Sequence, residues 1–281
     1  MPFPIIDISN IDDPKYQLKI AQQITDACKQ WGFLLIKGHP IPPEDIQEMF
    51  NLGKEFFSLP EDDKAPWPIN KNQIGYIGSF KDRNKDDKMS MWFGGLPGTL
   101  EKDLSAAPPF WRTKANKIEA FKHECHALVL KLLVCFGIAM DLPDREFFAK
   151  AHKGEHWQRQ QLEDVDVAGL EVLAPNGEWV KAPCEKDCIL INLGDALSFW
   201  SGNQLKATLH RVTFDELPHD KERQSMAYFG AAHPDTVLQP LLSGVKMGEY
   251  HSNGMSLEPG ITVGELNNRI MTSIYGPALK V

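Results

Sequence analysis

The chain has 281 residues, a formal net charge of -8, and 42% hydrophobic and 24% charged residues. This is the composition of a globular protein with enough apolar residues for a sizeable core, so it excludes an intrinsically disordered chain. The negative charge is spread along the sequence, which argues against nucleic acid and against an anionic membrane surface as partners. The first residues lack the basic and apolar regions of a signal peptide, and no later window is apolar enough to span a membrane, so we expect a cytoplasmic protein.

Cysteine usage points to reduced thiols. The chain has five cysteines, an odd count that does not suit a disulfide framework. Cys184 and Cys188 lie four positions apart without a second Cys or His pair at zinc-site spacing, which makes zinc a poor interpretation. We therefore interpret all five as reduced or buried thiols.

Helical and extended patterns alternate through the first 110 residues. In chain order they predict a helix over 16–31, a strand over 33–36, a helix over 44–57, and short strands around 76–77 and 91–93. The intervening sequence is rich in Pro, Gly and charged residues, which predicts loops.

The second half changes in texture. Apolar residues at intervals of three and four predict a long amphipathic helix over 114–140. Short apolar runs separated by turn residues then follow at 170–173, 189–194, 209–214 and 226–229. This pattern is typical of an antiparallel β-sandwich or barrel.

A block of motifs in these runs carries the strongest signal. Residues 189–195 read Ile-Leu-Ile-Asn-Leu-Gly-Asp, residues 200–212 read Trp-Ser-Gly-Asn-Gln-Leu-Lys-Ala-Thr-Leu-His-Arg-Val, and residues 223–229 read Arg-Gln-Ser-Met-Ala-Tyr-Phe. The block resembles the N-x-G-D, H-R-V and R-x-S motifs of the 2-oxoglutarate and iron(II)-dependent oxygenases of the isopenicillin N synthase type. Segments 4–9 and 27–39 resemble the amino-terminal region of that family, so the resemblance covers almost the whole chain.

The resemblance implies a fold, a domain organisation and a site. The fold would be mainly β with flanking helices, a double-stranded β-helix or jelly roll. Residues 1–110 would form the amino-terminal helix and strand region, and residues 111–281 the long helix and the jelly-roll core, packed as one unit. His210 would be the distal histidine ligand of the iron, while Arg223 and Ser225 would bind the far carboxylate of 2-oxoglutarate.

The chemistry of these side chains suits those roles. A neutral imidazole is a good ligand for Fe(II). A planar guanidinium matches a carboxylate in bidentate fashion, and a serine hydroxyl supplies a further donor. An isolated histidine would more often be a hydrogen-bonded core residue, and it is the surrounding motif that favours a ligand here.

The remaining iron ligands of the family are missing. Relatives carry them as H-x-D, a motif that this sequence lacks and whose position would fall near 153–155. Two interpretations stay open. Residues 153–166 form a solvated helix or loop that bridges a deletion, or residues 152–166 supply substitute ligands, His152 or His156 together with Glu155, Asp164 or Asp166.

Other candidate residues have less specific interpretations. His123 and His126 lie three positions apart on the predicted long helix without an H-E-x-x-H pattern, so we expect them on its solvated face. Aromatic side chains could line a substrate pocket or simply fill the core, and burial is the commoner fate. These are Tyr76, Trp92, Phe93 and Tyr228.

The sequence thus predicts an Fe(II) and 2-oxoglutarate-dependent dioxygenase. It would use O2 to hydroxylate, desaturate or cyclise a small organic molecule, in secondary metabolism, as a monomer. The alternative is a catalytically impaired relative or a redox-neutral enzyme that keeps the carboxylate pocket without the iron triad.

Overall fold

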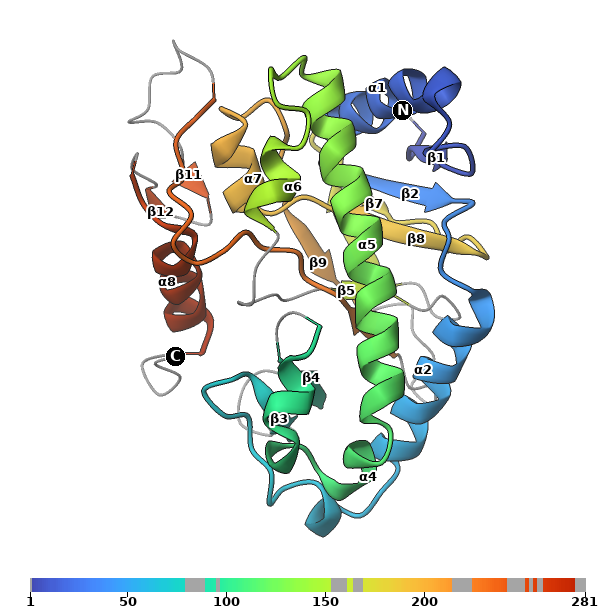
Figure 1. Ribbon diagram of the computed structural model, residues 1–281, viewed down its shortest axis with the longest axis vertical. Helices are drawn as coiled ribbons and strands as arrows, with labels where there is room; N and C mark the ends of the chain where they lie inside the picture. The colour runs from blue at the N-terminus through green and yellow to red at the C-terminus, as the bar shows by residue number, and fades with distance from the viewer. Residues whose placement is uncertain are drawn as a thin grey trace.

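The computed structural model places a long helix against several short sheets (Figure 1). It describes residues 2–78, 89–94, 97–152, 161–163, 169–213, 224–241, 251–252, 255–256 and 260–275. In the view of Figure 1 helix α5 (Ala115–Ala139) runs down the front of the molecule, with some of the strands passing behind it and others to its left. Among the described residues no helix is both long enough and apolar enough to cross a membrane.

The three long helices predicted from the apolar spacing are confirmed. Helix α1 spans Pro14–Gln30, and its Asp13 cap accepts a hydrogen bond from the amide of Lys15. Helix α2 spans Pro43–Phe57, and α5 is the predicted long helix. α1 packs directly against α5. Both helices bury an apolar face in the main core, which is where most of their stability comes from.

The other described helices are shorter. They are η1 (Glu61–Asp63), α3 (Thr99–Lys102), η2 (Leu104–Ala106), α4 (Pro109–Arg112), α6 (Phe147–Ala151), α7 (Asp195–Trp200) and α8 (Val263–Tyr275). Helix α7, which begins at the Asp of the Asn-Leu-Gly-Asp motif, was not expected from the sequence.

One sheet joins the two halves of the chain. Strand β1 (Ile5–Asp7) pairs in parallel with β2 (Phe33–Lys37), and β2 pairs antiparallel with β8 (Cys188–Asn192). β2 is buried over its first four residues. A strand buried on both faces reads as a continuous apolar run, which explains why 33–36 could be recognised in the sequence.

A second sheet carries the H-R-V motif. Its order is β7 (Trp179–Lys181), β6 (Leu170–Leu173) and β9 (His210–Val212), with all pairs antiparallel. Two-stranded sheets complete the described β structure. They are β5 (Gln161–Glu163) with β10 (Ser225–Ala227), β3 (Ile74–Ile77) with β4 (Ser90–Phe93), and β11 (His251–Ser252) with β12 (Met255–Ser256).

Strand β5 corrects one sequence interpretation. One of the two open interpretations is a solvated helix or loop over residues 153–166, but 161–163 are a strand that pairs with β10. Three residues are too few for an alternating pattern to be visible, and the partner strand lies some sixty positions further along the chain. The rest of 153–166 lies outside the described residues.

Two apolar clusters hold these elements together. The main cluster packs the helices against β1, β2 and β8, and its largest fully buried side chains include Trp111, Phe56 and Phe136. The smaller cluster lies between β2 and the sheet β7-β6-β9, and it consists of Trp31, Phe33, Leu170, Val172, Ala174 and Ala182. The smaller cluster therefore connects the amino-terminal turn before β2 to the sheet that carries His210.

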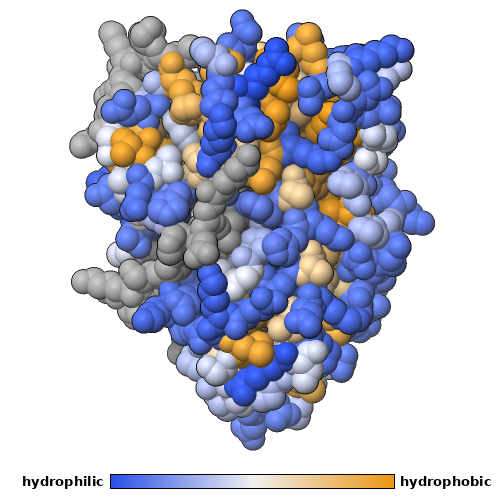
Figure 2. Space-filling model, viewed as in Figure 1, coloured by the Kyte–Doolittle hydropathy of each residue, from blue (hydrophilic) through white to orange (hydrophobic). Residues whose placement is uncertain are grey.

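The surface agrees with the composition. The face in Figure 2 is predominantly hydrophilic, with hydrophobic side chains showing in a broken band over the path of α5. Partly buried residues of α5 that pack against the core include Val129, Leu130 and Val134. All five cysteines are free thiols, as expected; three of them are buried, while Cys188 is half-buried and Cys184 is exposed.

Candidate functional site

His210 is the first residue of β9. Its Nδ1 lies 3.1 Å from the carbonyl oxygen of Thr208. A carbonyl oxygen can only accept, so Nδ1 carries the proton and donates it, and in the neutral ring Nε2 keeps the lone pair. Metal-binding histidines commonly have one ring nitrogen tied in this way while the other serves as ligand.

The inner face of the β7-β6-β9 sheet is buried at β6 and becomes accessible to solvent at β9. His210 pairs with Val172, and Val212 pairs with Leu170, so each pair shares one face of the sheet. Val172 is 0% and Leu170 5% exposed, whereas Val212 is 38% exposed and His210 is also exposed. The imidazole therefore stands where the covered inner face gives way to an accessible one, a position that a ligand can reach.

Ser225 lies on the accessible face of β10. Along this strand Ser225 and Ala227 are exposed, while the alternate residues Met226 and Tyr228 pack against the main core. This alternation follows from the two-residue period of a strand. It leaves the Ser225 hydroxyl available to donate to a carboxylate. Arg223, the predicted partner of Ser225, lies outside the described residues.

The substitute iron ligands can be followed only in part. Glu155, His156, Asp164 and Asp166 lie outside the described residues. His152 is described, and it is 7% exposed with its Nδ1 2.6 Å from the carbonyl oxygen of Phe148. Burial, and to a smaller extent His126, lowers the pKa of His152 to about 4. Such an enclosed imidazole does not fit the role of a ligand on the accessible face that carries His210.

His126 also departs from the sequence interpretation. We expected both helix histidines on the solvated face of the long helix. His123 is exposed, but His126 is half-buried, its Nδ1 is inaccessible, and it influences the pKa of His152. Helix α5 packs against α6 (Phe147–Ala151), and helical periodicity alone could not reveal that contact.

Of the proposed iron ligands that the structure describes, His210 has the properties of a ligand and His152 does not. The described residues contain no group of three His, Cys, Asp or Glu side chains that could hold a metal ion. His210 has the exposure and the tautomer of a ligand, and Ser225 has the exposure of a carboxylate donor. The described donor set is thus one imidazole together with one hydroxyl from a different sheet.

Most of the candidate aromatic residues belong to the core. Tyr76 is 3% exposed, and its hydroxyl donates to Glu61 at 3.1 Å. Phe93 packs edge-on against Trp111, with ring centroids 4.8 Å apart. Tyr228 also packs on the core, and burial raises the pKa of its hydroxyl, with smaller effects from neighbouring groups. Of the four, Trp92 is half-exposed on β4 and keeps the pocket interpretation open.

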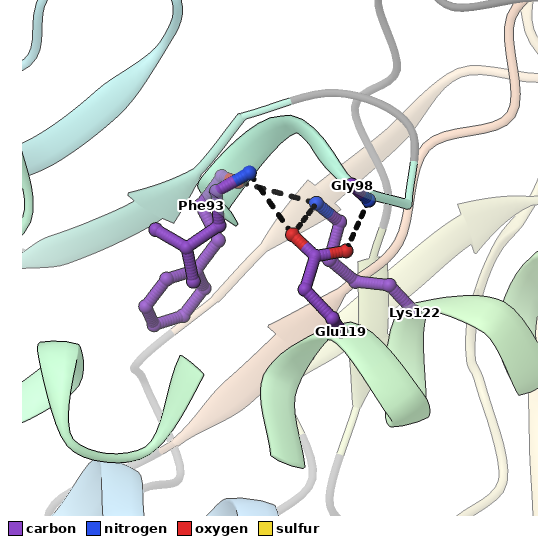
Figure 3. Close-up of polar contacts among 5 residues, drawn as sticks. Phe93, Gly98, Glu119 and Lys122 are labelled. Atoms are coloured by element: carbon purple, nitrogen blue, oxygen red, sulfur yellow. Dashed lines mark hydrogen bonds and ion pairs between the residues drawn. The ribbon is translucent and has the colours of Figure 1, made fainter. Parts of the chain in front are cut away.

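A buried ion pair on α5 was missed in the sequence. Figure 3 shows Glu119 and Lys122 with Phe93, at the end of β4, and Gly98, which precedes α3; these two residues flank the segment between β4 and α3. The Lys122 Nζ lies 3.1 Å from Glu119 Oε1, and the two side chains are only 8% and 5% exposed. Glu119 accepts from the amides of Gly98 and Leu100, and Lys122 donates to the carbonyl of Phe93. The pair therefore joins both ends of that segment to α5.

Comparison with known protein families gives two matches. The model of the amino-terminal domain of non-haem dioxygenases, described for morphine synthesis, matches residues 3–113. The model of the 2OG-Fe(II) oxygenase superfamily matches residues 155–231, which include β9 and β10.

Individual proteins agree. The chain is 30% identical to the UPF0676 protein C1494.01 of Schizosaccharomyces pombe, with 97% of this chain and 92% of the relative covered. It is 24% identical to the 2-oxoglutarate-Fe(II) type oxidoreductase hxnY of Emericella nidulans, with 98% and 91% covered. Both alignments, over 315 and 326 residues, are longer than this chain, so these relatives carry residues that it lacks.

A solved structure shows the same fold. A full-length Neurospora crassa protein, crystallised in complex with α-ketoglutarate and 5-formyluracil, superposes with a TM-score of 0.74 at 23% identity and 96% coverage of each chain. The jelly roll with flanking helices predicted from the motifs is thereby confirmed. With both halves of the chain matched, this protein belongs to the 2-oxoglutarate and Fe(II)-dependent oxygenase family, a family of dioxygenases that use Fe(II), 2-oxoglutarate and O2 on small-molecule substrates.

Proposed function

We propose that this chain oxidises a small organic molecule by hydroxylation, desaturation or ring closure, as an enzyme of secondary metabolism. The observation that carries the proposal is the His210 imidazole, which stands on an accessible sheet face with its Nδ1 proton bonded to Thr208. Fe(II) and 2-oxoglutarate supply the oxidising chemistry when bound. The chain's own residues bind and orient the reactants.

Each site residue has a defined task in this proposal. His210 offers Nε2 to the metal. Arg223 and Ser225 bind the far carboxylate of 2-oxoglutarate, the guanidinium by a two-point contact and the hydroxyl by a further hydrogen bond. Ser225 supports this assignment because it lies on the accessible side of β10.

The substrate is proposed to be a free small molecule. The Neurospora crassa protein has been solved with thymine and with 5-formyluracil, so a protein of this fold accepts a free pyrimidine base. The net charge of -8 disfavours a nucleic-acid polymer. We further propose a cytoplasmic monomer in which residues 1–110 and 111–281 pack as one unit.

Metal titration tests the proposal. Anaerobic Fe(II) is titrated into the purified chain, and succinate is then measured after addition of 2-oxoglutarate and O2. We expect one equivalent of iron and succinate formation, both lost in His210→Ala. Iron binding that is unchanged in His210→Ala would overturn the ligand assignment.

The missing H-x-D motif favours a second candidate function. In it the chain retains the carboxylate cradle without an iron triad and serves as a binding protein or a redox-neutral enzyme. One imidazole cannot hold a divalent ion firmly against water. Calorimetry with 2-oxoglutarate in the presence of a chelator separates the two functions. Unimpaired binding without metal, together with no succinate when iron is added, would favour the second.

A further inference from the structure

A turn far from β9 in the sequence borders the His210 imidazole. Phe33, the first residue of β2, lies with its ring centroid 5.3 Å from that of His210 and with the ring planes 68° apart. Phe33 is 1% exposed and belongs to the smaller apolar cluster, so its own ring is fixed. A fixed ring in edge contact restricts the plane that the imidazole can adopt.

Gly32, the preceding residue, fixes the segment that leads into β9. Its φ is +65°, and a Cβ there would clash with the carbonyl oxygen of Lys206 and lie 2.5 Å from Oγ1 of Thr208. Only glycine accommodates both the conformation and the contact. The backbone ahead of β9 therefore lies directly against the turn between α1 and β2.

Two backbone hydrogen bonds hold the same arrangement. The amide of Lys206 donates to the carbonyl of Cys28 at 3.1 Å, and the amide of Leu193 donates to the carbonyl of Gly32 at 2.9 Å. The first bond ties the approach to β9 to the end of α1. The second ties the turn to the residue that follows β8. Thr208, whose carbonyl accepts the Nδ1 proton of His210, thus sits on an anchored segment.

We propose that Gly32 and Phe33 are positioning residues for His210, an inference that rests on the ligand role given to His210 above. Gly32 sets the place of the Thr208 carbonyl and thereby keeps the proton on Nδ1. Phe33 sets the plane of the ring. Together they hold Nε2 as the free nitrogen on the accessible face, so the amino-terminal region shapes the site without touching the metal.

The tautomer of His210 tests this in the metal-free protein. Long-range ¹H–¹⁵N NMR on ¹⁵N-histidine-labelled protein at pH 8 identifies which ring nitrogen carries the proton, and His210→Ala assigns the signal. We expect a single Nδ1–H form in the wild type. In Phe33→Leu and Gly32→Ala we expect a mixture of the two tautomers.

Matched controls separate positioning from general destabilisation. Gly177 has a φ of +84° with nothing within 4 Å of an added Cβ, so Gly177→Ala carries similar backbone strain without the contact. Phe136 is 2% exposed on α5, so Phe136→Leu removes equal apolar volume elsewhere. Both should keep the Nδ1–H form. Circular dichroism checks that each variant is folded. If Gly32→Ala does not fold, the His210 tautomer in Phe33→Leu tests the positioning role by itself.

Metal affinity gives a second readout. We expect Co(II), followed by its visible absorption, to bind Phe33→Leu about tenfold more weakly than the two controls, as is usual when support around a ligand is lost. If Gly32→Ala and Phe33→Leu both keep the wild-type His210 tautomer and the wild-type Co(II) affinity, the positioning role is wrong, and the proposed function is not affected. Co(II) binding unchanged in His210→Ala would instead remove the ligand assignment on which both rest.

Discussion

Ser225 lies on the accessible side of β10, where its hydroxyl should contribute to the binding of 2-oxoglutarate. Ser225→Ala removes one hydrogen bond from a neutral hydroxyl to the ionised carboxylate of 2-oxoglutarate, so we expect affinity to fall about tenfold, equivalent to roughly 1.4 kcal/mol. Ser225→Thr keeps the hydroxyl and should retain most of the affinity. Isothermal calorimetry with 2-oxoglutarate measures both. Equal affinity in the alanine variant and the wild type would remove Ser225 from the cradle.

Arg223 should matter more than Ser225. Arg223→Lys keeps the charge but loses the planar fork, so 2-oxoglutarate should bind about ten- to a hundredfold more weakly. Circular dichroism of the same sample shows whether the fold is retained. Because the two residues would bind the same carboxylate, the double variant should lose less than the two single losses combined. Strict additivity would indicate separate sites.

Individual residues could be predicted from the sequence where they belong to a motif, but not where they depend on contacts between distant parts of the chain. His210 and Ser225 could be proposed as site residues because their motifs are long and specific. The contact of Phe33 with His210 and the close approach of Gly32 to Lys206 join positions far apart in the chain. No local pattern encodes such contacts, and a single sequence without an alignment cannot reveal them.

At the scale of elements, the Glu119–Lys122 pair on α5 gives a stability prediction. Lys122→Met leaves the Glu119 carboxylate buried beside the amides of Gly98 and Leu100 without its cation. Breaking a buried pair in this way should reduce the free energy of unfolding by about 3 kcal/mol. Urea denaturation followed by fluorescence measures the change.

The same helix offers the control. Lys117 pairs with Glu48, and these side chains are 58% and 43% exposed. Lys117→Met should therefore change the free energy of unfolding by less than about 1 kcal/mol. The double variant Glu119→Gln with Lys122→Met should recover part of the loss, since it removes the isolated charge. A Lys122→Met loss no larger than that of Lys117→Met would mean that the buried pair contributes nothing particular.

Element prediction succeeded where local periodicity was strong. The helices α1, α2 and α5 follow apolar repeats over fifteen or more residues, and their ends were predicted closely. Strand β5 was missed because three residues show no period and its stability comes from pairing with β10. The buried ion pair was missed for a related reason: two charges at i and i+3 on a helix usually indicate a solvated face.

At the scale of the whole molecule, the sequence predicted strands at 33–36 and 189–194 but not that they pair. The register Leu35↔Leu190 joins the amino-terminal region to the jelly-roll half in one sheet. Apolar runs show that a strand is buried without naming its partner. The pairing is seen only in the structure, although the two family models do match the chain on either side of α5.

The folded chain should lose stability in acid, and this is a property of the whole chain because unfolding exposes His152 to water. In the fold, burial lowers the pKa of His152 to about 4 from an ordinary value of 6.5. Between pH 6.5 and the pKa of His152 in the folded chain, this imidazole is protonated in the unfolded chain but stays neutral in the folded one. His152 therefore makes stability fall as the pH drops from 6.5 towards 4, by at most about 1.4 kcal/mol per pH unit.

Urea denaturation at pH 7.5, 6 and 5 measures this slope. Burial also lowers the pKa of His39, so the wild-type slope contains that contribution as well. His152→Gln keeps a polar side chain near the Phe148 carbonyl but cannot titrate, so its stability should fall less steeply towards pH 5 than that of the wild type. At pH 7.5 the variant should be less stable than the wild type, because a buried ring has been replaced. In His39→Gln the slope of stability against pH should also be shallower than in the wild type, but by a smaller amount than in His152→Gln. A His152→Gln slope equal to that of the wild type would mean that this imidazole is protonated as readily in the folded chain as in the unfolded one.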